Sequence, residues 1–223
     1  MVIAGPIDAY VTSLRGALRG PRSAKADLLT EARDGLTDAA EHYESTGLPR
    51  LAAERLAVAD FGPVADIAPE YQRELALTQA RRTAALVGAA VAAQSLVSEL
   101  AWRHESTSWT WQPNNLYALL ANTVDYAAYA VVAAALLAAL ACGIGARYVT
   151  VGRSFARATG IAAIVVVAFF IAGGILLSAF SPAWTSHSGT GISAWNAAAS
   201  AATMTLPVWM TVSGLRCVRA AAA

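Results

Sequence analysis

Six charged or titratable residues in the apolar part of the sequence form a predicted outer polar cluster, whose carboxylates and imidazoles could bind a metal ion or carry a proton. They are Glu99, Arg103, His104, Glu105, Asp125 and His187. Carboxylates and imidazoles at one membrane depth would suit a metal or proton sensor, because such groups are costly to place in lipid. The competing interpretation is structural, since Glu99 and Arg103 are four residues apart on one helical face and would pair. We favour the structural interpretation and predict no resident metal.

Motifs of known catalytic sites are absent from the sequence. It has no GxGxxG or Walker loop, no HExxH zinc motif and no GxSxG serine motif. The two cysteines, Cys142 and Cys217, are too far apart in sequence for metal-ligand spacing, and we expect them to be packing residues. We therefore predict that the protein is not an enzyme and carries no cofactor.

Five acidic residues recur at helical spacing in the polar part of the sequence. They are Asp27, Glu31, Asp34, Asp38 and Glu41. Alternating steps of four and three place them on one face of a helix, where like charges repel by a few tenths of a kcal/mol. This acidic ridge is interpreted either as a solvated outer face or as a docking surface for a basic partner. Arg15, Arg19 and Arg22 could neutralise part of it within the chain.

Charged residues are few and unevenly distributed. They make up 14% of the 223 residues, against roughly 25% in soluble domains, and 22 of them lie between Asp8 and Arg82. The sequence thus predicts two domains, a helical head over residues 1–82 and an apolar domain over residues 83–223. The net charge of +1 argues against direct nucleic-acid binding.

Four apolar stretches in the second domain are long enough to cross a bilayer, which takes about 20 residues. They cover residues 83–102, 124–144, 158–180 and 195–215. The fourth is the weakest, because alanine and threonine dominate it and Pro207 interrupts its hydrogen bonds. The predicted fold class is therefore all-α, a small cytoplasmic helical domain followed by a four-helix transmembrane bundle.

The arginines that flank these stretches predict the orientation. They are Arg81, Arg82, Arg147, Arg153, Arg157, Arg216 and Arg219. All seven fall on one side of a four-span topology, and basic flanks face the cytoplasm. We therefore expect a multi-pass protein of the bacterial plasma membrane with both termini in the cytoplasm. The same arginines would contact anionic lipid headgroups of the bilayer.

Small residues on the third stretch predict close helix packing. Ala168 with Ala172, and Gly174 with Ser178, form small-xxx-small pairs. The sequence leaves open whether this packing occurs within one chain or in a homo-oligomer.

The head reads as helices with an apolar stripe on each. The stripes are Ile7, Tyr10, Val11, Leu14 and Leu18 on the first helix; Leu29, Ala32, Leu36, Ala40 and Tyr43 on the second; and Leu51, Leu56 and Ala59 on the third. We expect Ser23 to cap the second helix, Gly47 to end it, and the third to close at Phe61–Gly62. A further helix is expected to run without a break from Pro69 to Trp102.

Within the head, the runs DLLTEARDGLTDAAEHYESTG (residues 27–47) and LAAERLAVADFGPVADIAPEY (residues 51–71) resemble the HTH-associated α-helical signalling (HAAS) domain, also met as a permease prefix domain. The matching positions are Glu31, Asp34, Leu36, Gly47, Ala53, Phe61, Gly62, Ile67 and Ala68. The resemblance implies a membrane signalling or regulatory protein whose head docks a cytoplasmic protein, with a PadR-like transcriptional regulator as the suspected partner. The alternative is an accessory or permease-type subunit of a membrane transport complex.

Overall fold

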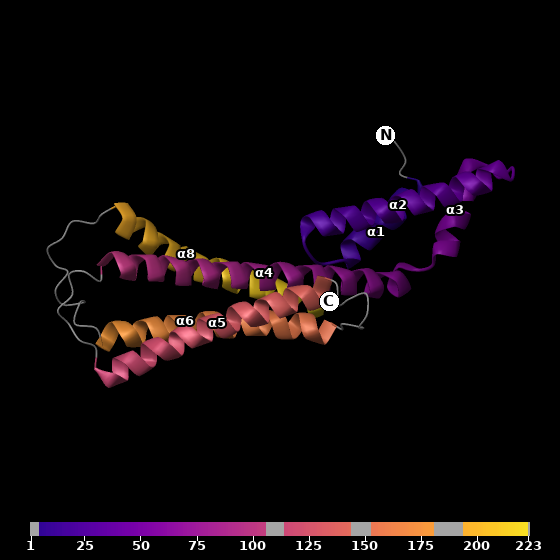
Figure 1. The fold of residues 1–223 in the computed structure, drawn as a ribbon. Coiled ribbons are helices and arrows are strands. Elements are labelled where there is room, and N and C mark those ends of the chain that lie inside the picture. The colour runs from indigo at the N-terminus through magenta and orange to yellow at the C-terminus, as the bar shows by residue number, and fades with distance from the viewer. Residues whose placement is uncertain (1–4, 106–113, 144–152, 181–193, 223) are drawn as a thin grey trace. The chain divides into compact units, whose positions relative to one another are not determined.

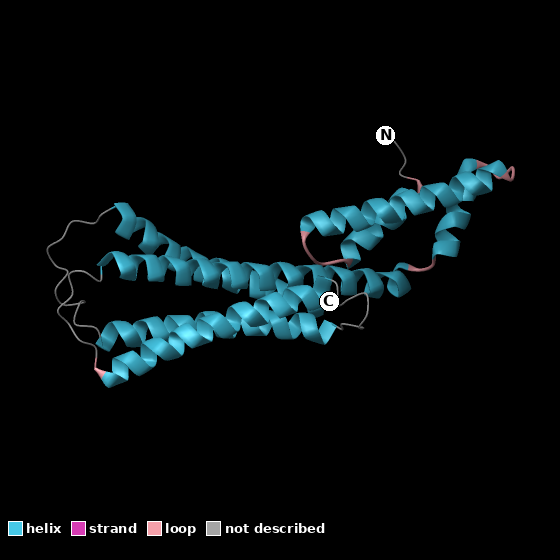
Figure 2. Ribbon diagram, in the orientation of Figure 1, coloured by secondary structure: helices cyan, strands magenta, loops and turns pink. Residues whose placement is uncertain are grey.

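The structure is a computed structural model that describes residues 5–105, 114–143, 153–180 and 194–222. All regular structure in these ranges is α-helical, so the predicted all-α class is confirmed (Figures 1 and 2). The helices are α1 (Pro6–Ala17), α2 (Arg22–Ser45), α3 (Arg50–Phe61), α4 (Val64–Glu105), α5 (Asn115–Gly143), α6 (Arg153–Phe180) and α8 (Ala194–Ala222).

These residues form two compact units. The head unit contains residues 5–79 together with 153–156 and 219–222. The bundle unit contains the described residues of 80–151 and 157–218. Three helices, α4, α6 and α8, therefore contribute residues to both units.

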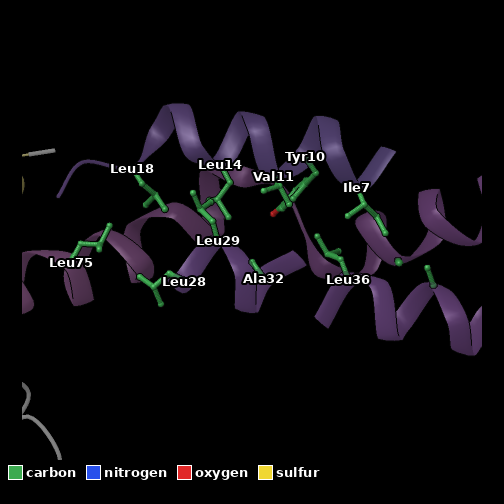
Figure 3. Close-up of a cluster of buried hydrophobic side chains, with 12 residues drawn as sticks. Ile7, Tyr10, Val11, Leu14, Leu18, Leu28, Leu29, Ala32, Leu36 and Leu75 are labelled. Carbon is green, nitrogen blue, oxygen red and sulfur yellow. The ribbon is translucent and has the colours of Figure 1, made fainter. Parts of the chain in front are cut away.

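The core of the head unit is built from the predicted stripes of α1 and α2. All five stripe residues of α1 are buried, and on α2 only Tyr43 is half-buried. Leu14 and Leu36 have no exposed surface, and neither does Leu75 from α4, which completes the same cluster (Figure 3). Burying such side chains stabilises the fold by about 1.5–3 kcal/mol each.

Glycines end α2 and α3 at the predicted positions. Gly47 and Gly62 both have φ of 97°, a backbone conformation that side chains other than glycine rarely adopt. Gly47 donates its amide to the Glu44 carbonyl oxygen at 2.9 Å, which closes the end of α2. The prediction that Ser23 caps α2 is wrong, because α2 already begins at Arg22 and the capping position belongs to Pro21.

Helix α4 is one continuous helix of 42 residues. At 1.5 Å per residue its length is about 63 Å. It begins at Val64, five residues before the start predicted at Pro69. Pro69 lies in the second turn of the helix. Proline there removes a single amide donor without ending the helix. The expected uninterrupted helix as far as Trp102 is confirmed.

Helices of the bundle unit approach closely where glycine removes a side chain. A Cβ atom on Gly88 of α4 would lie 3.0 Å from Ala135 Cβ of α5, and one on Gly173 of α6 would lie 3.1 Å from a Val124 methyl of α5. The closest approach joins α6 to α8: a Cβ atom on Gly160 would lie only 2.8 Å from the Gly214 carbonyl oxygen. Backbones this close require glycine on both helices.

The small-residue pairs of α6 that were expected to pack against another helix do not do so among the described residues of one chain. Ala168, Ala172, Gly174 and Ser178 are all exposed, and a Cβ atom on Gly174 would meet nothing within 4 Å. The physical reason is helical phase, since the face of α6 that is buried carries Ala156, Gly160, Ala163 and Val167 at steps of three and four.

Three helices of the described chain are long and apolar enough to cross a membrane. They are Val64–Leu100 within α4, Asn115–Gly143 and Ser154–Phe180. α8 is helical over the fourth predicted span and contains 29 residues, but it is not one of the three. The fourth span stays a prediction.

Candidate functional site on the head unit

The acidic ridge lies on the outer face of α2. Asp27, Glu31, Asp34, Asp38 and Glu41 are all exposed, whereas Leu29, Ala32, Leu36 and Ala40 on the opposite face are buried. None of the five carboxylates forms an ion pair with a described residue. The structure therefore presents five solvated negative charges in one row along α2.

The structure does not show the predicted neutralisation of the ridge by the arginines on and after α1. Arg15, Arg19 and Arg22 are exposed and form no ion pair with it in the described chain. The ion pair between α1 and α2 instead joins Asp8 to Arg33, with 2.7 Å between Arg33 Nη1 and Asp8 Oδ1. Sequence reasoning missed this pair, because neither residue belongs to an apolar stripe or to the ridge.

Lys25 of α2 hydrogen-bonds carbonyl oxygens at the C-terminal end of α1. Its Nζ atom donates to the carbonyl oxygens of Arg15 at 2.6 Å and Leu18 at 2.7 Å. These are carbonyls that a helix leaves without a partner at its C-terminus, where positive charge is also favourable. Partial burial, followed by the positive charges of Arg15 and Arg19, lowers the pKa of Lys25.

The predicted apolar stripe of α3 is wrong. Leu51 and Leu56 are exposed by 60% and 37%, and the residues that face the core are Ala53, Glu54 and Ala57. Two leucines five residues apart cannot share one helical stripe, whereas Ala53 and Ala57 are four apart. The spacing of the alanines was the signal in the sequence. It follows that α3 exposes both of its leucines to solvent, whereas Phe61 at its end packs against Tyr10.

Glu54 is the buried acidic residue of α3. Arg50 pairs with its Oε1 atom at 3.2 Å, while its Oε2 atom has no hydrogen-bond partner among the described residues. A Cβ atom on Gly5 would lie 2.5 Å from that Oε2 atom, so the carboxylate points at the residue before α1. Negative charge at a helix N-terminus is favourable, which compensates part of the burial of Glu54.

Tyr71 of α4 lies close enough to the ridge to respond to it. Burial is the main cause that raises the pKa of Tyr71, and the negative charges of Glu31, Glu74 and Glu70 add to it. The ridge residue Glu31 therefore acts electrostatically on the first part of α4.

Gln72 of α4 joins three segments of the head unit. Its Oε1 atom accepts from the Arg19 amide at 2.8 Å, and its Nε2 atom donates to the Arg19 carbonyl oxygen at 2.7 Å. The same Nε2 atom donates to the Ala220 carbonyl oxygen at 2.6 Å, so the last turn of α8 is tied to α4. Gln72 is only 3% exposed, and no pattern in the sequence pointed to it.

The predicted outer polar cluster is described only in part. Glu99 on α4 and Asp125 on α5 are exposed. Arg103, His104 and Glu105 belong to the last turn of α4 but their side chains lie outside the description, as does the whole of His187. Among the described residues no group of three potential metal ligands occurs. The sensing and pairing interpretations of this cluster both stay predictions.

Of the arginines that flank the predicted spans, Arg81 lies beside the end of α5. A Cβ atom on Gly143, the last residue of α5, would lie 3.6 Å from the Arg81 guanidinium carbon. Thr83 of α4 hydrogen-bonds the Ser213 hydroxyl of α8, with 2.9 Å between the oxygens. Arg81, Arg82, Arg157 and Arg216 are exposed in the bundle unit, as is Arg219 in the head unit; the Arg153 side chain and the whole of Arg147 lie outside the description.

Comparison with known proteins gives one match. No curated protein and no solved structure matches the chain. The HAAS family model matches residues 9–70, a segment that begins in α1 and ends in the second turn of α4. The head segment that carries the acidic ridge and the exposed leucines of α3 is thus similar to HAAS domains.

Proposed function

We propose that the protein is a non-enzymatic, membrane-anchored regulatory protein whose head binds a protein partner in the bacterial cytoplasm. The observation that carries the proposal is α4, which supplies Leu75 to the head core and continues as one helix into an apolar segment that ends at Leu100. The HAAS-like, highly charged segment and the proposed apolar anchor are thereby connected by one continuous helix.

Exposed apolar side chains on the bundle unit support an anchoring role. Leu136 and Leu137 of α5 are 60% and 68% exposed, and Ile175 of α6 is 67% exposed. Such extensive apolar surface is unfavourable in water and favourable against lipid chains. The proposal therefore assigns α5, α6 and the part of α4 that belongs to the bundle unit to the bilayer, with α8 as the fourth span.

The arginines support an orientation with both termini in the cytoplasm. The Arg81 guanidinium lies beside Gly143 at the end of α5, which is consistent with basic flanks that share one face of the membrane. Each arginine near an anionic leaflet contributes about 1 kcal/mol of attraction. The head would then lie on the side of the membrane where transcriptional regulators are found.

The suspected partner is a PadR-like transcriptional regulator. The resemblance to HAAS domains, which are partner-docking modules, implies such a partner, and the match covers α2 and α3, whose outer surfaces are exposed. The proposal makes this protein a membrane tether for the regulator and gives it no direct contact with DNA.

Binding of purified proteins tests this function. The full chain in nanodiscs of zwitterionic lipid is immobilised, and a PadR-like regulator from the same genome is titrated by biolayer interferometry. Saturable binding, absent from empty nanodiscs, is the expected result. A folded full chain that binds no PadR-like regulator of that genome would count against the proposed partner. Reporter fusions at residues 1 and 223 test the orientation, and an external N-terminus would overturn it.

A further inference from the structure

Positive charge is concentrated where α1 ends and α2 begins. Residues 9–26 include three arginines and one lysine and no acidic residue. Arg15, Arg19 and Arg22 are exposed and form no ion pair with a described residue. The acidic residues of α2 begin only at Asp27, so the two signs of charge are separated along this part of the head.

Contacts within the head unit hold these positive charges together. Lys25 of α2 binds two carbonyl oxygens at the end of α1, one of them that of Arg15. Lys25 also lies close enough to Arg15 and Arg19 for their charges to act on it. A Cβ atom on Gly20 would lie 2.9 Å from the Leu75 Cβ atom, so the connection between α1 and α2 packs directly on α4.

The last turn of α8 adds a fourth arginine at the same place. The Gln72 carboxamide binds the amide and the carbonyl oxygen of Arg19 and also the Ala220 carbonyl oxygen, so both segments lie beside one residue of α4. Arg219, which precedes Ala220, is exposed and forms no ion pair with a described residue. We call these four residues the basic corner of the head: Arg15, Arg19, Arg22 and Arg219.

We propose that the basic corner binds the headgroups of anionic lipids and thereby docks this end of the head on the cytoplasmic leaflet. The inference rests on the proposed anchoring and orientation. It goes beyond them because it extends lipid contact from the arginines that flank the predicted spans to α1 and α2. Guanidinium groups suit this ligand, since they donate several hydrogen bonds to a phosphate in addition to attracting its charge.

The position of the corner along two helices favours lipid as the ligand. Ala220 lies five residues beyond the predicted fourth span, and Gln72 lies eleven residues before the predicted first span. These separations correspond to about 8 Å and 17 Å of helix. A headgroup layer is about 5–8 Å thick, and its attraction for positive charge extends over a Debye length of about 8–10 Å. The corner therefore lies within the field of an anionic leaflet.

An acidic protein segment fits the corner less well. The large apolar residues at this end of the head, Leu18, Leu28 and Leu75, are buried, so the corner offers no apolar anchor of the kind that stabilises protein interfaces (Figure 3). Charge alone suits a membrane, where many headgroups act at once and each arginine increases binding about fivefold. The acidic ridge would be repelled by the same leaflet, which leaves the corner as the surface that faces lipid.

Quenching of a fluorophore by lipid with a spin label on its headgroup tests the proposal in the full chain. Ala17, exposed between Arg15 and Arg19, is replaced by cysteine (Ala17→Cys) and labelled; the unsubstituted chain, whose described cysteines are buried, gives the background. Nanodiscs of phosphatidylcholine are compared with nanodiscs in which a third of the lipid is phosphatidylglycerol. We expect stronger quenching in the anionic nanodiscs at low ionic strength and loss of the difference at high salt.

Matched substitutions assign the effect to the corner. Arg19→Gln should lower the ratio of docked to undocked heads about fivefold, whereas Arg19→Lys, which keeps the charge, should retain docking. Arg55→Gln removes an exposed arginine of α3 and should leave quenching unchanged. Equal effects of Arg19→Gln and Arg55→Gln would overturn the corner in favour of the net charge of the head. Equal quenching of the wild-type head in both nanodiscs would overturn lipid docking itself.

Two further measurements separate the ligands and the two proposals. Binding of soluble polyglutamate in phosphatidylcholine nanodiscs, without added quenching in anionic nanodiscs, would overturn lipid in favour of an acidic protein segment. If the PadR-like regulator binds the full chain while anionic lipid adds no quenching, the corner is wrong and the function stands. If quenching rises and depends on Arg19 while no PadR-like regulator binds, the corner stands and the suspected partner is wrong.

Discussion

Gln72 and Ala220 are joined by a buried hydrogen bond, in which the Nε2 atom of Gln72 donates to the Ala220 carbonyl oxygen at 2.6 Å. The other two bonds of the same carboxamide hold the Arg19 peptide between α1 and α2. One side chain therefore fixes both a loop and a helix end in the head unit.

Replacing Gln72 by leucine should destabilise the head by about 2 kcal/mol, because one buried and two part-buried backbone groups lose their partner. Hydrogen exchange of the Arg19 amide should accelerate, and the melting temperature of the full chain in detergent should fall. Gln94→Leu changes an exposed glutamine of the same helix and serves as the control. Unchanged exchange at Arg19 in the Gln72 variant would contradict the assignment.

Gly160→Ala should destabilise the bundle by about 1–3 kcal/mol, because its Cβ atom would meet the Gly214 carbonyl oxygen and the helices would have to move apart. Gly174→Ala in the same helix meets nothing within 4 Å and should be neutral or stabilise by up to about 1 kcal/mol through helix propensity. Thermal unfolding in one detergent compares the two variants. Equal melting temperatures would show that α6 and α8 do not cross at these glycines.

Lys25→Met should loosen the end of α1. The substitution retains an apolar stem but removes both bonds to the Arg15 and Leu18 carbonyl oxygens, at a cost of about 1–2 kcal/mol. Faster amide exchange in the last turn of α1 is the expected signature. Arg22→Met removes an exposed positive charge from the start of α2, the helix that carries Lys25, and controls for the loss of charge alone. An equal effect of the two variants would rule out the capping role of Lys25.

The Tyr43 hydroxyl donates to the Asp60 carboxylate, and this bond is the main cause that raises the pKa of Tyr43. A raised pKa in the folded state means that the protonated phenol is favoured there. Its contribution to stability is complete below the ordinary tyrosine pKa of about 10 and is lost as pH rises through the higher folded value. Asp60→Asn should lower the pKa of Tyr43, as measured by NMR titration of isotope-labelled tyrosine. The pKa of Tyr71, raised chiefly by burial, should not move in this variant.

Helical periodicity was sufficient to predict the elements of the head and the buried faces of α1 and α2. It failed on α3 because leucine was given more weight than spacing: the alanines at steps of four mark the buried face, while the leucines do not share a stripe. Phase also explains why the small residues of α6 that pack are Gly160 and Ala163 and not the more conspicuous pairs nearer its end.

Contacts between distant segments could not be predicted from the sequence. Gln72 is an ordinary polar residue on a helix until the Arg19 peptide and the end of α8 are brought beside it. The charges of the ridge were recognisable, since charge and spacing suffice to place them on one face. The outer face of α2 exposes no large apolar side chain, and this limits how strongly the ridge can bind a partner. It depends on which faces of α2 and α3 are buried in the folded head.

The bond between Gln72 and Ala220 also determines when the head can be finished during synthesis. Its two residues are 148 positions apart, with most of α4 and all of α5 and α6 between them. Although α1, α2 and α3 emerge first from the ribosome, their supporting helix lacks this bond until α8 has been translated. The nascent head therefore lacks this bond throughout the synthesis of α5 and α6, when chaperones and proteases have their longest access to it.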